Sequence, residues 1–233
     1  MIGTFGLNTC PDTTLCLTGA LDFYIIDREH GRASLSEASK LLSSISDTCE
    51  RFIRVSSCNR VEIQKVLELN PDGILVPQIS NLQEARNAVE WSYFPPIGSR
   101  GLSPYTRGFN FIHTDLENKK HQLNAALKLG LLIEGQSGFD VLSDIIEELG
   151  SQIHLLYFGL FDFANAKQVE ASWSNLELFS ALEEMVKNAN DAGIKVGTIA
   201  RSKDEISLLR DAGVTYIVFL NDLGILKLAV DEL

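Results

Sequence analysis

The sequence is poor in basic residues, and this shortage narrows the partners that we expect. It contains 20 Lys and Arg against 31 Asp and Glu in 233 residues, a formal net charge of −11. This balance argues against a nucleic-acid partner, because phosphate backbones are bound by clustered Lys and Arg side chains. Apolar runs also fall short of the roughly 20 residues that cross a bilayer, so we expect no membrane partner.

Cysteine is scarce as well, and its spacing is typical of neither a zinc site nor a redox site. Cys10, Cys16, Cys49 and Cys58 form no C-x-x-C pair. The first residues show no basic segment followed by an apolar one, which would be typical of a secretory signal peptide. We therefore predict a cytoplasmic protein with free thiols.

What the sequence does contain is a regular alternation of short apolar runs and longer amphipathic runs. The apolar runs predict eight strands, at 2–6, 23–27, 52–55, 73–76, 129–134, 153–158, 195–199 and 215–220. The amphipathic runs predict helices at 12–19, 34–46, 60–68, 82–91, 139–149, 176–192, 203–212 and 222–233, with a further polar helix near 116–127. Eightfold alternation predicts an α/β fold, a single-domain (β/α)8 TIM barrel over residues 1–233. The competing fold, a doubly wound open sheet, usually has a Gly-rich phosphate loop after its first strand, and this loop is missing.

One connection differs from the others and runs from about residue 93 to 128. It is rich in Pro and Gly and contains Arg100 and Arg107 before the polar helix. Long loops in compact domains are usually functional or mobile. We therefore predict a lid-like insertion over the mouth of the barrel. The alternative is a surface excursion that plays no part in the site.

Ionisable side chains follow the carboxyl ends of the predicted strands. Asp27 and His30 follow one strand, Arg54 lies within another, Glu134 ends a third, and Asp162 follows the next. In (β/α)8 barrels these strand ends carry the active site. The sequence therefore predicts that the five side chains face one site.

Glu134 and Asp162 are the candidate metal ligands. Two carboxylates without a nearby Cys or His cluster suit a hard divalent cation such as Mg²⁺ or Mn²⁺. Two protein ligands would leave coordination positions for water and for a chelating substrate. The alternative interpretation is a pair of unrelated charges on a solvated rim.

His30 and Arg54 are the candidate catalytic groups. A histidine in this turn suits a general base, although a surface histidine fits the pattern equally. The charge of Arg54 inside an apolar strand is costly unless it is paired. Its forked donors suit a carboxylate or an enolate. Glu68, by its pattern alone, is a solvated charge at a helix end.

Five stretches, taken in order, resemble the HpcH/HpaI aldolase family. Residues 23–31 resemble the family's strand ending in Asp-x-Glu-His-Gly, and 53–55 resemble its Val-Arg-Val. Residues 74–77 resemble its apolar strand that ends in Pro, and 93–101 resemble its Arg-Tyr-Pro-Pro-x-Gly-x-Arg-Gly loop. Residues 159–162 stand where the family has Gly-Pro-Ala-Asp. The resemblance implies a class II, metal-dependent pyruvate aldolase.

The resemblance also implies catalytic roles. His30 matches the catalytic base, and Glu68 matches an acidic position that orients this histidine. Asp27 belongs to the same catalytic segment as His30. Arg54 matches the arginine that holds the pyruvate carbonyl and stabilises the enolate.

Metal and substrate positions are implied in the same way. Glu134 and Asp162 match the ligands of a divalent cation: Mg²⁺, Mn²⁺ or Co²⁺. Phe5 stands where some members have a substrate-facing Trp. Arg100, in the Pro-Pro loop, is expected among the substrate-binding residues.

The sequence departs from the family pattern at the substrate end. Leu132 replaces a frequent Gln, and Leu160 with Phe161 replaces the Pro-Ala whose backbone amides receive the pyruvate carboxylate. The chain ends at Leu233, without the helices that swap between subunits in typical members. We therefore expect an altered substrate pocket, and a homo-oligomer that lacks this C-terminal helix swap.

These inferences predict a small-molecule 2-oxo acid substrate. The expected reaction cleaves or forms a C–C bond in a 4-hydroxy-2-oxo acid, giving pyruvate and an aldehyde through an enolate. One alternative is a related lyase acting on acyl-CoA or phosphoenolpyruvate-type substrates. Another is a non-catalytic barrel that binds an oxo acid or serves as a scaffold.

Overall fold

The protein, described in a computed structural model over residues 1–111 and 114–233, folds around eight parallel strands that close into a barrel. Every strand pairs with the next, and β8 pairs with β1. The predicted single-domain (β/α)8 barrel is confirmed. The strands are β1 (Ile2–Gly6), β2 (Phe23–Asp27), β3 (Glu50–Arg54), β4 (Gly73–Val76), β5 (Lys128–Ile133), β6 (Leu155–Phe158), β7 (Lys195–Ala200) and β8 (Tyr216–Asn221).

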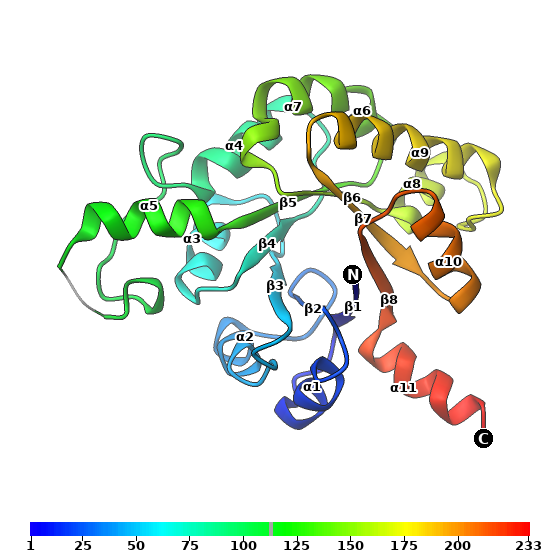
Figure 1. The fold of residues 1–233 in the computed structure, drawn as a ribbon, viewed down its shortest axis with the longest axis horizontal. Coiled ribbons are helices and arrows are strands. Elements are labelled where there is room, and N and C mark those ends of the chain that lie inside the picture. Colours follow the sequence, from blue (N-terminus) through cyan, green and yellow to red (C-terminus); the bar gives the residue numbers. More distant parts are fainter. Residues whose placement is uncertain (112–113) are drawn as a thin grey trace.

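Helices surround these strands on the outside of the barrel (Figure 1). They are α1 (Pro11–Thr18), α2 (Leu35–Leu42), α3 (Arg60–Glu68), α4 (Leu82–Ser92), α5 (Leu116–Ala126), α6 (Gln136–Asp140), α7 (Leu142–Leu149), α8 (Leu160–Lys167), α9 (Leu176–Asp191), α10 (Lys203–Asp211) and α11 (Asp222–Asp231). Two short 3-10 turns, η1 (Arg107–Phe109) and η2 (Gly150–Gln152), complete the described elements. Within the described residues, no helix is long and apolar enough to span a bilayer.

Polar side chains begin several of the helices that follow strands. Ser34 forms a capping box with Glu37 at α2, and Asn59, Asn175 and Ser202 accept backbone N–H groups at the starts of α3, α9 and α10. Such caps satisfy amide groups that have no partner inside the helix. They therefore fix where the loops at the carboxyl ends of the strands stop and the helices start.

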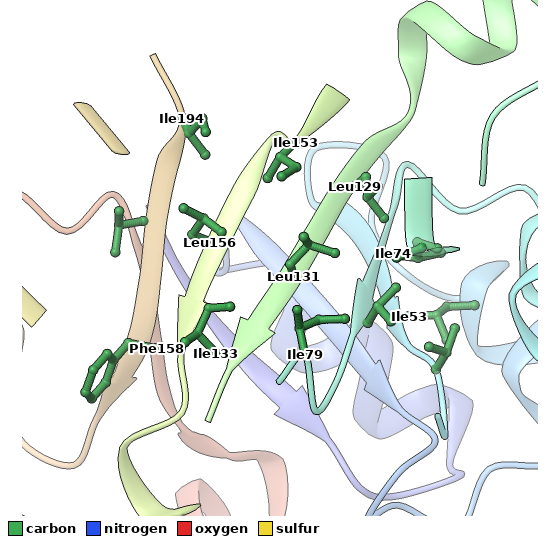
Figure 2. Packing of buried hydrophobic residues seen from close by; sticks show 14 of the residues in the cluster. Ile53, Ile74, Ile79, Leu129, Leu131, Ile133, Ile153, Leu156, Phe158 and Ile194 are labelled. Atoms are coloured by element: carbon green, nitrogen blue, oxygen red, sulfur yellow. The ribbon is translucent and has the colours of Figure 1, made fainter. Parts of the chain in front are cut away.

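The alternation of side chains along each strand builds two apolar cores. On β5, Leu129, Leu131 and Ile133 lie on one face of the strand and pack in the larger core (Figure 2). Leu132, which points the other way, belongs to a second core inside the barrel. The buried members of this inner core are Phe5, Phe23, Ile25, Phe52, Leu75, Leu132, Leu155, Tyr157, Tyr216 and Val218.

Two helices differ from the prediction. The helix expected at 139–149 is divided into α6 and α7, because the backbone of Val141 leaves helical geometry (φ −104°, ψ 9°). Helix α8 was not predicted at all. It starts directly after β6 and buries Leu160, Phe163 and Ala164 on one face, but its short run merges with the apolar strand in the sequence.

The structure places the segment at 93–128 beside the amino ends of the strands of its own chain, away from the barrel mouth. Helix α4 returns the chain to the amino ends of the strands, and α5 leads straight into the start of β5 (Figure 1). Arg107 donates to Ser39 of α2 and to Ser43, which follows this helix. None of the described residues in this segment lines the cavities at the mouth. Residues 112–113 of the segment lie outside the described residues.

Candidate active site

A cavity of about 350 Å³ lies at the carboxyl ends of the barrel strands. A second cavity of about 300 Å³ shares His30, Glu134 and Asp162 with it. Nine side chains expected from the sequence line the first cavity: Phe5, Asp27, His30, Arg54, Leu132, Glu134, Leu160, Phe161 and Asp162. The strand ends therefore bring most of the predicted site together.

Arg54 is held by two carboxylates at the bottom of this site. Its Nε and Nη2 donate to the two oxygens of Asp27, at 2.9 and 2.6 Å, and its Nη1 lies 3.0 Å from Glu29 Oε2. The guanidinium also lies 4.5 Å from the ring centre of Phe5. A guanidinium has five N–H donors, so these contacts leave donors for a further acceptor. The charge of Arg54 inside the apolar strand is thus paired, and the plane of its guanidinium is fixed.

Asp27 organises the turn that carries His30. The side chain is 1% exposed. Besides binding Arg54, its Oδ1 accepts the backbone N–H groups of Glu29 and His30, at 3.0 and 3.2 Å. Asp27 therefore positions the base and the arginine together, and the register of β2 beside β3 sets Asp27 opposite Arg54.

His30 is exposed in this turn and borders both cavities. Its backbone is fixed by Asp27, and it lines the same space as Glu134 and Asp162. A ring in this position has access to a proton on a molecule bound in either cavity. The geometry suits the role of general base that the sequence predicted.

Glu134 lies in a strongly perturbed electrostatic environment. Burial, together with the neighbouring charges of Glu29 and Asp162, raises the pKa of its carboxyl to about 7. Gln78 N–H donates to Glu134 Oε2 at 2.9 Å, and Gln78 Nε2 donates to Glu29 Oε1 at 2.8 Å. Three acidic side chains are thus crowded around one partly buried position, and Gln78 connects two of them.

The surroundings of Glu134 and Asp162 indicate whether these residues fit a divalent cation. A Cβ atom at Gly159 would lie 2.6 Å from Glu134 Cγ, so this glycine leaves the space in which the carboxylate lies. Glu29 Oε2 is buried without a hydrogen bond among the described residues, despite its ion pair with Arg54. Within residues 1–111 and 114–233, no three acidic, His or Cys side chains form a ready-made cage. Two hard oxygen ligands, Glu134 and Asp162, with space beside them, fit an ion that keeps other ligands.

Glu68 and Arg100 lie outside the site, contrary to the prediction. Glu68 is in the last turn of α3, where it accepts from Gln64 Nε2 at 3.5 Å, and it lines neither mouth cavity. Arg100 is buried beside α3, where its Nη2 donates to Leu67 O at 3.1 Å. A helix that follows a strand ends at the opposite face of the barrel, so the end of α3 lies far from the turn of His30. Within one chain the expected pair of Glu68 and His30 does not form.

Several residues of the site are not among those predicted from the sequence. Glu29 belongs to the motif that contains His30, and Gln78 follows the end of β4. Both could have been predicted from their positions at the carboxyl ends of strands. Nothing in the sequence indicated Tyr157, because an aromatic residue inside an apolar strand is typical of a core residue. The cavity also includes Leu7, Gly159, Ile199, Leu220 and Asn221.

Comparisons with known proteins identify relatives of this chain. The family model described as HpcH/HpaI aldolase/citrate lyase matches residues 13–224. The 2-keto-3-deoxy-L-rhamnonate aldolase of Shigella dysenteriae is 23% identical over 94% of this chain and 81% of its own length. The 5-keto-4-deoxy-D-glucarate aldolase of Klebsiella pneumoniae is 25% identical over 97% of this chain and 87% of its own.

A solved structure is similar over the whole fold. An HpcH/HpaI aldolase/citrate lyase family protein from Burkholderia cenocepacia superimposes with a TM-score of 0.91 at 21% identity. The match covers 100% of this chain and 92% of that one.

Proposed function

The chain belongs to the HpcH/HpaI aldolase/citrate lyase family, and on that premise we propose that it is a metal-dependent aldol lyase of 4-hydroxy-2-oxo acids. The products are pyruvate, or a related 2-oxo acid, and an aldehyde. The aldolase names of its relatives support this class of carbon–carbon lyase. A homo-oligomer in the cytoplasm remains our expectation for its assembly and location.

The observation that carries the proposal is the combination of Arg54, His30 and Glu134 around one cavity. Arg54 offers a fixed cation with spare donors, His30 an accessible base, and Glu134 with Asp162 a pair of hard oxygen ligands. Cleavage beside a 2-oxo group needs these three functions, because negative charge develops on the oxo oxygen while a proton leaves the 4-hydroxyl.

Glu134 and Asp162 are the residues that would hold the metal. A divalent cation bound there would act as a Lewis acid toward the 2-oxo group and would help to orient the substrate. The raised pKa of Glu134 supports this assignment, because a carboxylate crowded by other carboxylates gains most from a nearby cation.

The chain's own side chains carry out the proton transfer and stabilise the developing charge. Arg54 donates to the 2-oxo oxygen and stabilises the charge that it acquires when the C3–C4 bond breaks. His30 accepts the proton of the 4-hydroxyl, which becomes the aldehyde oxygen. The electron pair of the broken bond remains on the pyruvate enolate, and the protonated His30 returns the proton to C3. Asp27 and Glu29 keep Arg54 in place throughout.

A coupled assay of pyruvate release tests the proposal. The purified protein is screened against 4-hydroxy-2-oxo acids with Mg²⁺, Mn²⁺ or Co²⁺, and then with a chelator in excess. We expect release that depends on the metal and that is lost in Glu134→Gln. Glu148→Gln is the matched control, since Glu148 forms an exposed ion pair with Arg86. Full activity of Glu134→Gln would refute the metal site, and no release from any acid with metal bound would refute the reaction.

A further inference from the structure

The cavity is divided into a polar sector and an apolar sector along the rim of the barrel. The charged side chains come from the ends of β2, β3 and β5 and from the first turn of α8. The opposite arc, formed by β1, β7 and β8, contributes Phe5, Leu7, Ile199, Leu220 and Asn221. The charged groups that can bind the 2-oxo acid half of a substrate are thus concentrated on one side of the cavity.

Three further apolar side chains line the cavity from the polar arc itself, Leu132 from β5 and Leu160 and Phe161 from the first turn of α8, and together with the opposite arc they make up the apolar sector. Leu132 and Leu160 are each 1% exposed, whereas Phe161 is 48% exposed at the entrance. All three line the same cavity. Asn221 is the neutral amide in this sector, and its Oδ1 already accepts the N–H of Gly224 at the start of α11. Hydroxyl groups of a substrate would find few partners here.

A second carboxylate on the substrate would also find no further Lys or Arg among the described residues that line the cavity. Among the described residues that line the cavity, Arg54 is the only Lys or Arg, and Asp27 and Glu29 already pair with it. A buried carboxylate without a cation is strongly disfavoured. An apolar chain, by contrast, gains from leaving water in proportion to the area that it buries.

From this division we propose that the aldehyde half of the substrate is an apolar hydrocarbon chain, without a second carboxylate or several hydroxyl groups. This proposal rests on the aldol reaction proposed above. The 2-oxo acid half occupies the polar sector, and the hydrocarbon chain lies against Leu132, Leu160 and Ile199. Phe161 covers the chain at the entrance.

Three substrates with tails of equal heavy-atom number test the proposal. They are 4-hydroxy-2-oxo acids that carry a pentyl, a carboxyethyl or a dihydroxypropyl tail, and pyruvate release is measured for each. We expect kcat/KM for the pentyl compound to exceed both others by at least tenfold. A preference for either polar tail would overturn this proposal and leave the aldol reaction standing. Release from none of them would overturn the reaction itself.

Leu132 provides the variant for the same test. Leu132→Gln adds an amide to the apolar sector, so the ratio of pentyl to dihydroxypropyl kcat/KM should fall by about fivefold or more. Leu132→Met keeps the sector apolar and should keep the ratio within about twofold. Thermal unfolding of both variants checks that the barrel is intact. An unchanged ratio in a folded Leu132→Gln protein would contradict the position given to the tail.

A second, independent observation concerns Tyr157 on β6. Its side chain is 3% exposed inside the barrel, and its ring centre lies 5.8 Å from that of Phe5 in an edge-to-face arrangement. A Cβ atom at Gly197 would lie 2.9 Å from Tyr157 Cδ2, so the glycine of the neighbouring strand makes room for the ring. The ring is therefore fixed from two sides.

The hydroxyl of Tyr157 has no hydrogen-bond partner among the described residues, although it is buried. A buried donor without a partner is unusual and destabilising. Burial raises the pKa of this hydroxyl, Arg54 lowers it, and Glu134 and Asp27 raise it further. The group thus stays protonated, and the charges that act on it belong to the polar sector of the cavity that it lines.

We infer that the Tyr157 hydroxyl donates a hydrogen bond to an oxygen of the bound 2-oxo acid half. Like the first inference, this one rests on the proposed reaction. The oxygen belongs to the carboxylate or the 2-oxo group, since Arg54 and Glu134 face the same end of the substrate. Tyr157 is then a substrate-binding residue, and the ligand supplies the missing partner.

Binding of oxalate, a compact analogue of the pyruvate enolate, tests this without any aldehyde. Calorimetry with Mn²⁺ present compares wild type with Tyr157→Phe, which keeps the ring and its packing. We expect oxalate to bind about tenfold more weakly to the variant. Tyr216→Phe is the control, because the Tyr216 hydroxyl donates to Glu50, outside the cavity, and it should change affinity less than twofold.

Equal affinity of wild type and Tyr157→Phe would overturn this inference. So would an equal loss in Tyr216→Phe, which would indicate a general effect on the barrel. If oxalate binds to none of the proteins while Mn²⁺ does, the proposed function itself fails.

Discussion

Arg54 is a buried cation within an apolar strand, and a charge in this position is costly unless it is paired. The structure identifies Asp27 and Glu29 as the partners and shows that the plane of the guanidinium is fixed by both. Partners of this kind depend on the register of β2 beside β3, which one strand alone does not reveal.

Substitutions of Arg54 should separate charge from geometry. Arg54→Lys keeps the charge but loses the planar fork. Arg54→Ala loses both, so we expect kcat/KM to fall further, by on the order of 3 kcal/mol in transition-state stabilisation, as for the loss of an oxyanion donor. Steady-state kinetics with the preferred acid measure both. Arg86→Ala, which removes an exposed ion pair, is the control. Equal activity of Arg54→Ala and Arg86→Ala would contradict the role of Arg54.

His30→Ala should lower kcat by roughly a hundredfold or more, the usual contribution of a positioned base. Affinity for the metal should change much less, because Glu134 and Asp162 remain. Turnover and calorimetric metal binding are measured on the same preparation. A near-normal kcat in His30→Ala would mean that another group moves the proton.

At the scale of elements, the strands were predictable and the connections were not. All eight strands were located within about two residues, because near-continuous apolar runs are typical of strands buried on both faces. Their carboxyl ends then located most of the site. Helix α8 was missed since its first residues continue an apolar run, and the segment 93–128 was misplaced since its composition does not reveal which face of the barrel it joins.

The amino ends of four strands carry a polar network that makes a prediction about pH. Lys128 donates to Glu50, Tyr216 donates to Glu50 at 2.9 Å, and His154 Nε2 lies 3.1 Å from the Tyr216 hydroxyl. Burial, and then the charge of Lys128, lowers the pKa of His154 below its ordinary 6.5. The folded protein therefore binds this proton less readily than the unfolded chain does.

The sign of the effect follows from linkage. Neutral His154 contributes stability that is present above about pH 6.5 and is lost as the pH falls through its lower folded value. Between pH 7 and 5 His154 lowers the free energy of unfolding, whereas Glu134, whose folded pKa is about 7, raises it as its carboxyl takes up a proton. His154→Gln removes the first contribution alone, so the variant should lose less stability, or gain more, than wild type as the pH falls through this range. Urea titrations at several pH values measure this. The exposed His121→Gln is the control and should keep the wild-type slope. A wild-type slope in His154→Gln would contradict the prediction.

For the whole molecule, the sequence was sufficient to predict the closed barrel and its reactive end, and insufficient for contacts between distant elements. Glu68 illustrates the limit, because a residue aligned with a family motif still lies at the other end of its helix. Tyr157 illustrates the reverse case, in which a core-like aromatic residue lines the cavity.

Metal binding should stabilise the folded molecule as a whole. A cation that binds only the folded state at 100 times its Kd adds about 2.7 kcal/mol to the free energy of unfolding. We expect Mn²⁺ to raise the Tm of wild type and of Glu148→Gln, but not of Glu134→Gln. Differential scanning calorimetry with and without chelator measures these shifts. An equal shift in Glu134→Gln would show that the cation binds elsewhere.

The most direct test of the central claim, that the barrel mouth forms a pyruvate enolate, requires no knowledge of the aldehyde. Pyruvate is incubated in D₂O with the protein and a divalent cation, and NMR follows the loss of its methyl protons. We predict exchange catalysed by wild type and dependent on the metal, and slowed by about a hundredfold in Arg54→Ala. The absence of exchange in a folded, metal-bound wild-type protein, or an undiminished rate in Arg54→Ala, would contradict the claim.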